Sequence, residues 1–220
     1  MHRLFRPLFE RAKTMRAKTM RASACLLLLA GLTSCADVYY YGPAGPSGRT
    51  VYLEGYDPGD SRYAGQPTDM SSWWKGDGVP GKPHIVISLS KQQAFFYKNG
   101  ELVGVSSLST GDENHPTPTG HYTISQKNQY HQSSQYGDYV DYEGNVVMSN
   151  VDRHVDKQPP GTKYDGANMH YFMRFTGGIG MHAGYLPGYP ASHGCVRMPV
   201  DMAQAFFRNV SVGTPVEVRY

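Results

Sequence analysis

The stretch "HIVISLSKQQAFFYKNGELVGVSSLST", residues 84–110, decides the fold class, because it holds several apolar runs separated by short polar breaks. Its Val, Ile, Phe and Tyr residues favour β-strands, and Asn99-Gly100 is the dipeptide that two-residue hairpin turns prefer. The stretch therefore predicts a strand at 84–90 that is followed by a β-hairpin.

Similar short apolar segments continue to the end of the chain. Further strands are expected at 120–126, 169–175 and 178–184, and in the closing "TPVEVRY". Only "PVDMAQAFFRNV", residues 199–210, has apolar residues at helical spacing, with a proline at its beginning. We therefore predict a mostly β domain over residues 82–220, a sandwich or barrel-like fold with one helix near its C-terminal end.

Residues 127–168 are the least regular part of this domain. They are polar and show no sustained period of 2 or 3.6 residues. An unstructured loop of this length is unusual in a compact domain. The segment therefore either contains a hairpin around "EGN" (143–145) or forms a lid, and we favour a lid that contains a hairpin.

The beginning of the chain has the layout of a secretory signal. Basic residues precede the apolar run "ACLLLLAGL" (24–32), which is too short to span a membrane as a mature helix. The run ends in "LTSC" (32–35), which resembles the lipobox of bacterial lipoproteins. This resemblance implies that residues 1–34 are a signal peptide and that Cys35 becomes lipidated. The alternative is a plain cleaved signal in which Cys35 has no role.

Residues 35–81 are rich in Gly, Pro, Ser and Tyr and predict a lipid-anchored linker. The alternative for its aromatic clusters "VYYYG" (38–42) and "SSWW" (71–74) is that they pack on the domain or line its cleft. Ala36 follows Cys35. In proteobacterial sorting this resembles an outer-membrane destination, so the periplasmic face of the outer membrane is favoured over the inner membrane.

The net charge of +3 belongs to the signal, not to the domain. Seven of the 21 Lys and Arg residues and one of the 18 Asp and Glu residues lie in 1–34, which leaves 14 basic and 17 acidic residues and a net charge of −3. This balance gives no electrostatic case for binding nucleic acid. Cys25 leaves with the signal and Cys35 would be acylated, so Cys195 has no intramolecular disulfide partner.

The candidate chemistry lies in "GMHAGYLPGYPASHGCVRM", residues 180–198, which contains His182, His193 and Cys195. A free thiol with a pKa of about 8.5 is only slightly ionised at neutral pH, so a nucleophilic cysteine needs a base or a cation beside it. A histidine can take the thiol proton and later return a proton to a leaving amine. Gly194 permits a positive φ, which would let the N–H groups of Gly194 and Cys195 form an oxyanion hole.

Several alternatives for this segment stay open. His-Gly-Cys can be an ordinary turn with a packed thiol, and His182, His193 and Cys195 are also competent zinc ligands, although no paired ligand spacing is present. Ser192 can orient the turn and is also a candidate substrate contact. Arg197 can hold a substrate carboxylate or brace the loop. Tyr171 and Arg174 are candidates for the cleft wall, although strand packing explains them equally well.

"SHGCVRM" (192–198), preceded by the histidine of "GMHAG" (180–184), resembles the signature of the L,D-transpeptidases, the YkuD-type catalytic domain. "TGDENHPTPTGHYTI" (110–124) resembles the second landmark of that family. The resemblance covers roughly residues 82–220. His182 and Ser192 lie closer together than in the commonest family pattern, so the loop between them is shorter.

The resemblance implies that Cys195 is the nucleophile and His182 the general acid and base, while His193 shapes the loop or touches substrate. The implied substrate is a peptidoglycan stem peptide, attacked at the bond between its third residue and the terminal D-alanine. The acceptor is left open between diaminopimelate, a lysine of an envelope lipoprotein, and water, which would make the enzyme an L,D-carboxypeptidase or endopeptidase. No metal or organic cofactor is implied. The competing class is a non-enzymatic peptidoglycan-binding lipoprotein.

Overall fold

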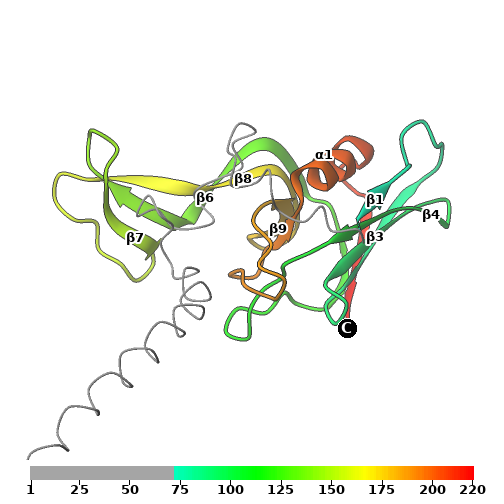
Figure 1. Ribbon diagram of the computed structural model, residues 1–220, viewed down its shortest axis with the longest axis horizontal. Helices are drawn as coiled ribbons and strands as arrows, with labels where there is room; N and C mark the ends of the chain where they lie inside the picture. Colours follow the sequence, from blue (N-terminus) through cyan, green and yellow to red (C-terminus); the bar gives the residue numbers. More distant parts are fainter. Residues whose placement is uncertain (1–71) are drawn as a thin grey trace, which may run out of the picture. The chain divides into compact units, whose positions relative to one another are not determined.

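The computed structural model of the chain describes residues 72–220 (Figure 1). The expected signal peptide, Cys35 and the linker up to residue 71 lie outside these described residues. No helix among residues 72–220 is long and apolar enough to cross a membrane.

The described residues form two β-sheets and one α-helix. The six-stranded sheet has the order β1-β4-β3-β2-β11-β5, with β1 (Trp73–Trp74), β2 (Pro83–Ser88), β3 (Gln93–Lys98), β4 (Glu101–Ser107), β5 (Gly120–Thr123) and β11 (Pro215–Arg219). The five-stranded sheet has the order β10-β9-β8-β6-β7, with β6 (Gln126–Val140), β7 (Val146–Asp152), β8 (Lys163–Thr176), β9 (Ile179–Ala183) and β10 (Val196–Met198). The prediction of a mostly β domain with one helix is confirmed.

The hairpin and the helix form where the sequence predicts them. β3 and β4 are antiparallel and join at Asn99 and Gly100, whose φ angles of 49° and 86° are those that a tight two-residue hairpin turn requires. The helix, α1 (Val200–Asn209), begins directly after Pro199. A proline fits there because the first helical turn does not use its missing N–H group.

The two sheets and α1 share one hydrophobic core. Ile85 and Phe96 enter it from the six-stranded sheet, Met173 and Met181 from the five-stranded sheet, and Phe206 from the helix, and all five are fully buried. The core therefore fixes β8 and β9, the strands that carry Tyr171, Arg174 and His182.

Residues 127–168 are more regular than the sequence suggests. They form most of β6, all of β7 and the start of β8, and Figure 1 shows these strands extending together away from α1. The hairpin around residues 143–145 is present, because β6 and β7 are antiparallel and the Asn145 N–H donates to Asp141 Oδ1 at 2.7 Å across the turn. Much of β6 is exposed on both faces, so it lacks the apolar alternation by which strands are recognised.

Part of the expected linker belongs to the folded domain. β1 pairs with β4, and the Trp74 ring lies 5.0 Å from the Phe96 ring and 5.7 Å from the Phe206 ring. Lys98 Nζ donates to the carbonyl oxygens of Gly76 and Val79. The alternative in which the tryptophans of "SSWW" pack on the domain is therefore the one that the structure shows.

Replacing Trp74 with alanine is expected to lower the free energy of unfolding by about 2–4 kcal/mol, because the ring fills a gap between the sheet and α1. Trp73 is 36% exposed, so Trp73→Ala is the matched control and is expected to cost less than about 1 kcal/mol. Urea unfolding of both variants measures the difference. Equal small losses would mean that residues 72–81 do not help to stabilise the domain.

Candidate active site

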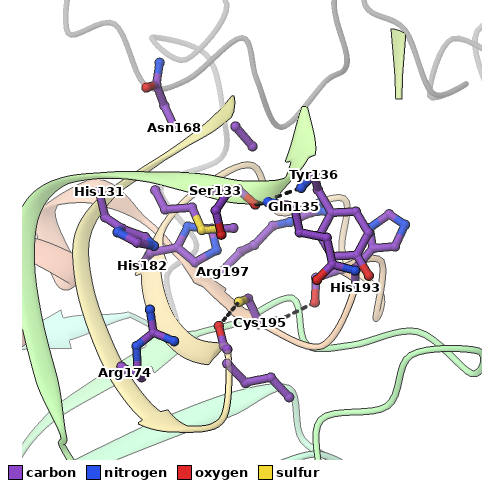
Figure 2. Close-up of a pocket in the computed structure, with 16 residues that line it drawn as sticks. His131, Ser133, Gln135, Tyr136, Asn168, Arg174, His182, His193, Cys195 and Arg197 are labelled. Atoms are coloured by element: carbon purple, nitrogen blue, oxygen red, sulfur yellow. Dashed lines mark hydrogen bonds between the residues drawn. The ribbon is translucent and has the colours of Figure 1, made fainter. Parts of the chain in front are cut away.

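His182 on β9, Arg197 on β10 and Cys195 in the loop before β10 come together at one cavity. β9 and β10 are parallel, with Arg197 opposite His182. Cys195 lies directly before β10, two residues before Arg197. All three line an open cavity of about 260 Å³, and Figure 2 shows them pointing into the same space.

The histidine is held in one orientation by the main chain. His182 is 4% exposed, and its Nδ1 lies 2.8 Å from the carbonyl oxygen of Ala183. A carbonyl oxygen only accepts hydrogen bonds, so this contact fits a proton on Nδ1 and leaves Nε2 as the basic nitrogen. Burial lowers the pKa of His182 from its ordinary value of 6.5 to about 4, so the imidazole is neutral at pH 7.

Cys195 is partly buried and lines the same cavity. Its Sγ is 3.9 Å from the carbonyl oxygen of Gly178, and it is the only cysteine among residues 72–220. Burial raises the pKa of Cys195, although a hydrogen bond from the Gly180 main chain and the charge of Arg197 oppose the rise. The sequence suggests a thiol ionised by its neighbours, whereas the buried site favours a neutral thiol beside a neutral imidazole.

The loop before the nucleophile is held by its own hydrogen bonds. Ser192 Oγ donates to the carbonyl oxygen of Cys195 and accepts the Gly194 N–H at 3.1 Å. Gly194 has a φ of 105°, a conformation that glycine adopts at little cost. The predicted oxyanion hole needs correction, because the Gly194 N–H is already bonded and only the Cys195 N–H is left for a substrate oxygen.

Ser192 and Arg197 support this loop. Ser192 is 3% exposed and its hydroxyl is used within the loop, so it orients the turn. It also lines the cavity, and its role as a substrate contact stays a prediction. Arg197 Nη2 donates to the carbonyl oxygen of Ala191 at 2.9 Å. Of the two roles considered for Arg197, the structure shows the bracing of the loop, although the side chain also lines the cavity.

Tyr171 and Arg174 lie on opposite faces of β8. Tyr171 accepts a hydrogen bond from Gln204 Nε2 at 3.0 Å and packs against Phe207 of α1, away from the cavity lining. Its prediction as a substrate contact is therefore wrong. Arg174 lies three residues further along β8, on the other face, and lines the cavity as expected. Its Nε donates to Gln126 Oε1 and its Nη1 to the carbonyl oxygen of Gly177.

β6 contributes a wall of the cavity that the sequence does not indicate. β6 pairs with β8 at Gln132↔Asn168 and again at Gly137↔Gly166, so residues 133–136 bulge out opposite the single residue Ala167. All four bulged residues line the cavity. The segment is polar and carries no periodic signal, and its register depends on pairing with β8, which sequence patterns do not reveal.

His193 lines the cavity beside Tyr136, as Figure 2 shows. Its ring stacks on the Tyr136 ring at 4.4 Å and lies 4.7 Å from the His115 ring. Burial lowers the pKa of His193, so this ring also favours the neutral form. His193 therefore shapes the cavity on the side away from His182.

Among residues 72–220, no three His, Cys, Asp or Glu side chains are arranged so that they could hold a metal ion.

A thiol and an imidazole whose Nδ1 is bonded to the main chain, at one cavity, make up a site for nucleophilic acyl transfer. The profile of the YkuD family, the L,D-transpeptidase catalytic domain, matches residues 82–218. The chain belongs to this family.

The relatives are themselves L,D-transpeptidases. L,D-transpeptidase 1 of Mycobacterium tuberculosis (strain ATCC 25618 / H37Rv) is 30% identical over 151 residues, which are 65% of this chain and 51% of the relative. The chain thus spans about half the length of that relative.

Among solved structures, an L,D-transpeptidase from Mycobacterium smegmatis matches with a TM-score of 0.46 and 20% identity, over 63% of this chain and 59% of that one. L,D-transpeptidase 3 from Mycobacterium tuberculosis, in complex with a faropenem-derived adduct, matches with a TM-score of 0.47 and 22% identity, over 63% of this chain and 61% of that one.

Proposed function

We propose that this protein is a peptidoglycan L,D-transpeptidase in which Cys195 forms a thioester with the third residue of a tetrapeptide stem. The single observation that supports this most is that Cys195 and His182 line the same cavity while Nδ1 of His182 is occupied by Ala183. Nε2 is then available to the thiol.

In the acylation step, Cys195 Sγ attacks the carbonyl carbon of the third residue while His182 Nε2 takes the thiol proton. The carbon–nitrogen bond to the terminal D-alanine breaks, and His182 returns the proton to the leaving amine. Burial keeps both groups neutral beforehand, so proton transfer accompanies the attack.

In the second step an amine attacks the thioester carbonyl, its proton passes to His182, and Sγ leaves and is reprotonated as a thiol. An amine of a second stem gives a 3→3 cross-link, and a lysine of an envelope lipoprotein gives an attached lipoprotein. With water as acceptor the products are those of an L,D-carboxypeptidase or endopeptidase. Arg174 is our candidate for a stem carboxylate, because it is a cavity-lining guanidinium that is only partly buried.

We also propose that Cys35 is the lipidated first residue of the mature protein and that the domain acts from the periplasmic face of the outer membrane. The support is the sequence pattern of residues 16–36. Residues 35–81 are rich in Gly, Pro and Ser, and a linker of this composition can extend far enough for an anchored domain to reach the cell wall.

The test is mass spectrometry of the products formed from purified disaccharide-tetrapeptide by the full-length chain in detergent. A dimer that lacks one D-alanine, and that is absent with Cys195→Ala, supports the transpeptidase. A Cys195-dependent tripeptide alone supports the hydrolytic alternative. If neither product forms, the non-enzymatic peptidoglycan-binding lipoprotein is the better account.

A further inference from the structure

We propose that Thr117 is a positioning residue, whose hydroxyl turns the Gly194–Cys195 peptide so that the Cys195 N–H faces the substrate oxygen under attack. This inference rests on the proposed acyl transfer. Thr117 lies far from Cys195 in the sequence, in the segment "TGDENHPTPTG" (110–120).

The hydroxyl of Thr117 is fully engaged. Thr117 is 3% exposed, its Oγ1 donates to the carbonyl oxygen of Gly194 at 2.8 Å, and the same oxygen accepts the Gly111 N–H at 2.9 Å. A buried hydroxyl that both donates and accepts is fixed in direction. The Gly194 carbonyl is therefore held toward Thr117.

The segment that carries Thr117 lies directly against the nucleophile loop. A Cβ atom on Gly111 would lie 2.1 Å from the carbonyl oxygen of His115 and 2.9 Å from Gly194 Cα, so only glycine fits there without a shift of the backbone. The Ser192 N–H donates to the carbonyl oxygen of Thr110 at 3.0 Å, and the Asp112 N–H donates to that of Ser192 at 3.0 Å. These contacts hold the beginning of the loop, and Thr117 holds the peptide directly before Cys195.

The direction of the Cys195 N–H follows from peptide geometry. The described residues contain no cis peptide bond, and in a trans peptide the C=O and the next N–H point in opposite directions. A Gly194 carbonyl held toward Thr117 therefore directs the Cys195 N–H away from Thr117. Because the Gly194 N–H donates to Ser192 Oγ, the Cys195 N–H is the one amide of the predicted pair that is left for an oxyanion.

The experiment compares two reactions of Cys195 in the full-length protein. Acylation by the disaccharide-tetrapeptide builds negative charge on a carbonyl oxygen, whereas alkylation by iodoacetamide displaces iodide and builds none. Thr117→Val keeps the side-chain shape but removes the hydroxyl. We expect acylation to slow by roughly 10- to 100-fold, since complete loss of an oxyanion donor costs about 10²–10³-fold, and alkylation to stay within about twofold of wild type.

Two further variants make the test specific. Thr117→Ser restores the hydroxyl and should recover most of the acylation rate. Thr119→Val changes an exposed threonine of the same segment and should behave like wild type. Equal acylation rates of wild type and Thr117→Val would overturn the inference. It would also be overturned if Thr117→Val lost alkylation as much as acylation, because this would indicate a displaced thiol. An unacylated wild type would instead count against the proposed function itself.

Discussion

Replacing Cys195 with alanine is expected to lower the rate of D-alanine release from a tetrapeptide stem by about 10⁴-fold or more, because the variant has no nucleophile to form the thioester. Residues 72–220 contain no second cysteine that could replace it. Cys195 lies in a loop held by Ser192, Thr110 and Thr117 rather than by its own side chain. The measurement is D-alanine release at saturating substrate, with unfolding of the variant followed in parallel.

The fold of Cys195→Ala should remain intact, with a change in the free energy of unfolding of about 1 kcal/mol or less, because few side-chain atoms are removed at the edge of an open cavity. Cys25→Ala is the matched control, since this residue lies in the expected signal, and it should retain the wild-type rate. Substantial D-alanine release by Cys195→Ala would show that the thiol is not the nucleophile.

Replacing His182 with alanine is expected to lower the rate of acylation by about 10²–10⁴-fold, the usual contribution of a positioned general base. The loss should be large because the neutral thiol of Cys195 depends on a neighbouring base for its proton. His121→Ala is the matched control, since His121 is an exposed histidine on β5 in the other sheet, and it should acylate like wild type. Single-turnover formation of the acyl-enzyme measures both.

The pH dependence of the wild-type enzyme follows from the same burial. His182 accepts a proton only when neutral, and its pKa is lowered from 6.5 to about 4. The acylation rate should therefore stay nearly constant as the pH falls from 7 to 5 and should drop only toward about pH 4. Alkylation of Cys195 should be slow below pH 7 and rise only in the alkaline range, because burial raises the thiol pKa.

A different profile would contradict this neutral pair. An acid limb near pH 6.5, together with rapid alkylation below pH 7 that slows in His182→Ala, would mean that the thiol and the imidazole are already charged before substrate binds. Such a result would leave the transpeptidase proposal standing and would overturn our view of the resting site.

The local elements of the fold could be predicted because each one carries its own signal. Asn99-Gly100 specifies a turn with two positive φ angles, and Pro199 marks the beginning of a helix with apolar residues at helical spacing. Most of β6 carries no such signal, because its two faces are both exposed and mostly polar, without apolar alternation. Its register depends on β8, and so does the bulge at residues 133–136 that lines the cavity.

The candidate site could be predicted only as far as its motif. The sequence singles out Cys195 and His182, and the structure brings both to one cavity. The sequence could not show that Tyr171 faces α1 while Arg174 faces the cavity, because this depends on which face of β8 meets the core. The sequence suggests that Ser192 orients the turn, but it could not show that the hydroxyl bonds the Gly194 N–H and the Cys195 carbonyl oxygen, since these partners depend on the fold of the loop.

The central claim is that Cys195 carries the stem peptide as a thioester, and the most direct test is the mass of the protein itself. The full-length chain would be mixed with disaccharide-tetrapeptide, quenched in acid, and digested to locate the modified residue. We predict an added mass equal to the substrate minus D-alanine, on the peptide that contains Cys195. Release of D-alanine without any covalent adduct, or an adduct on another residue, would contradict the account.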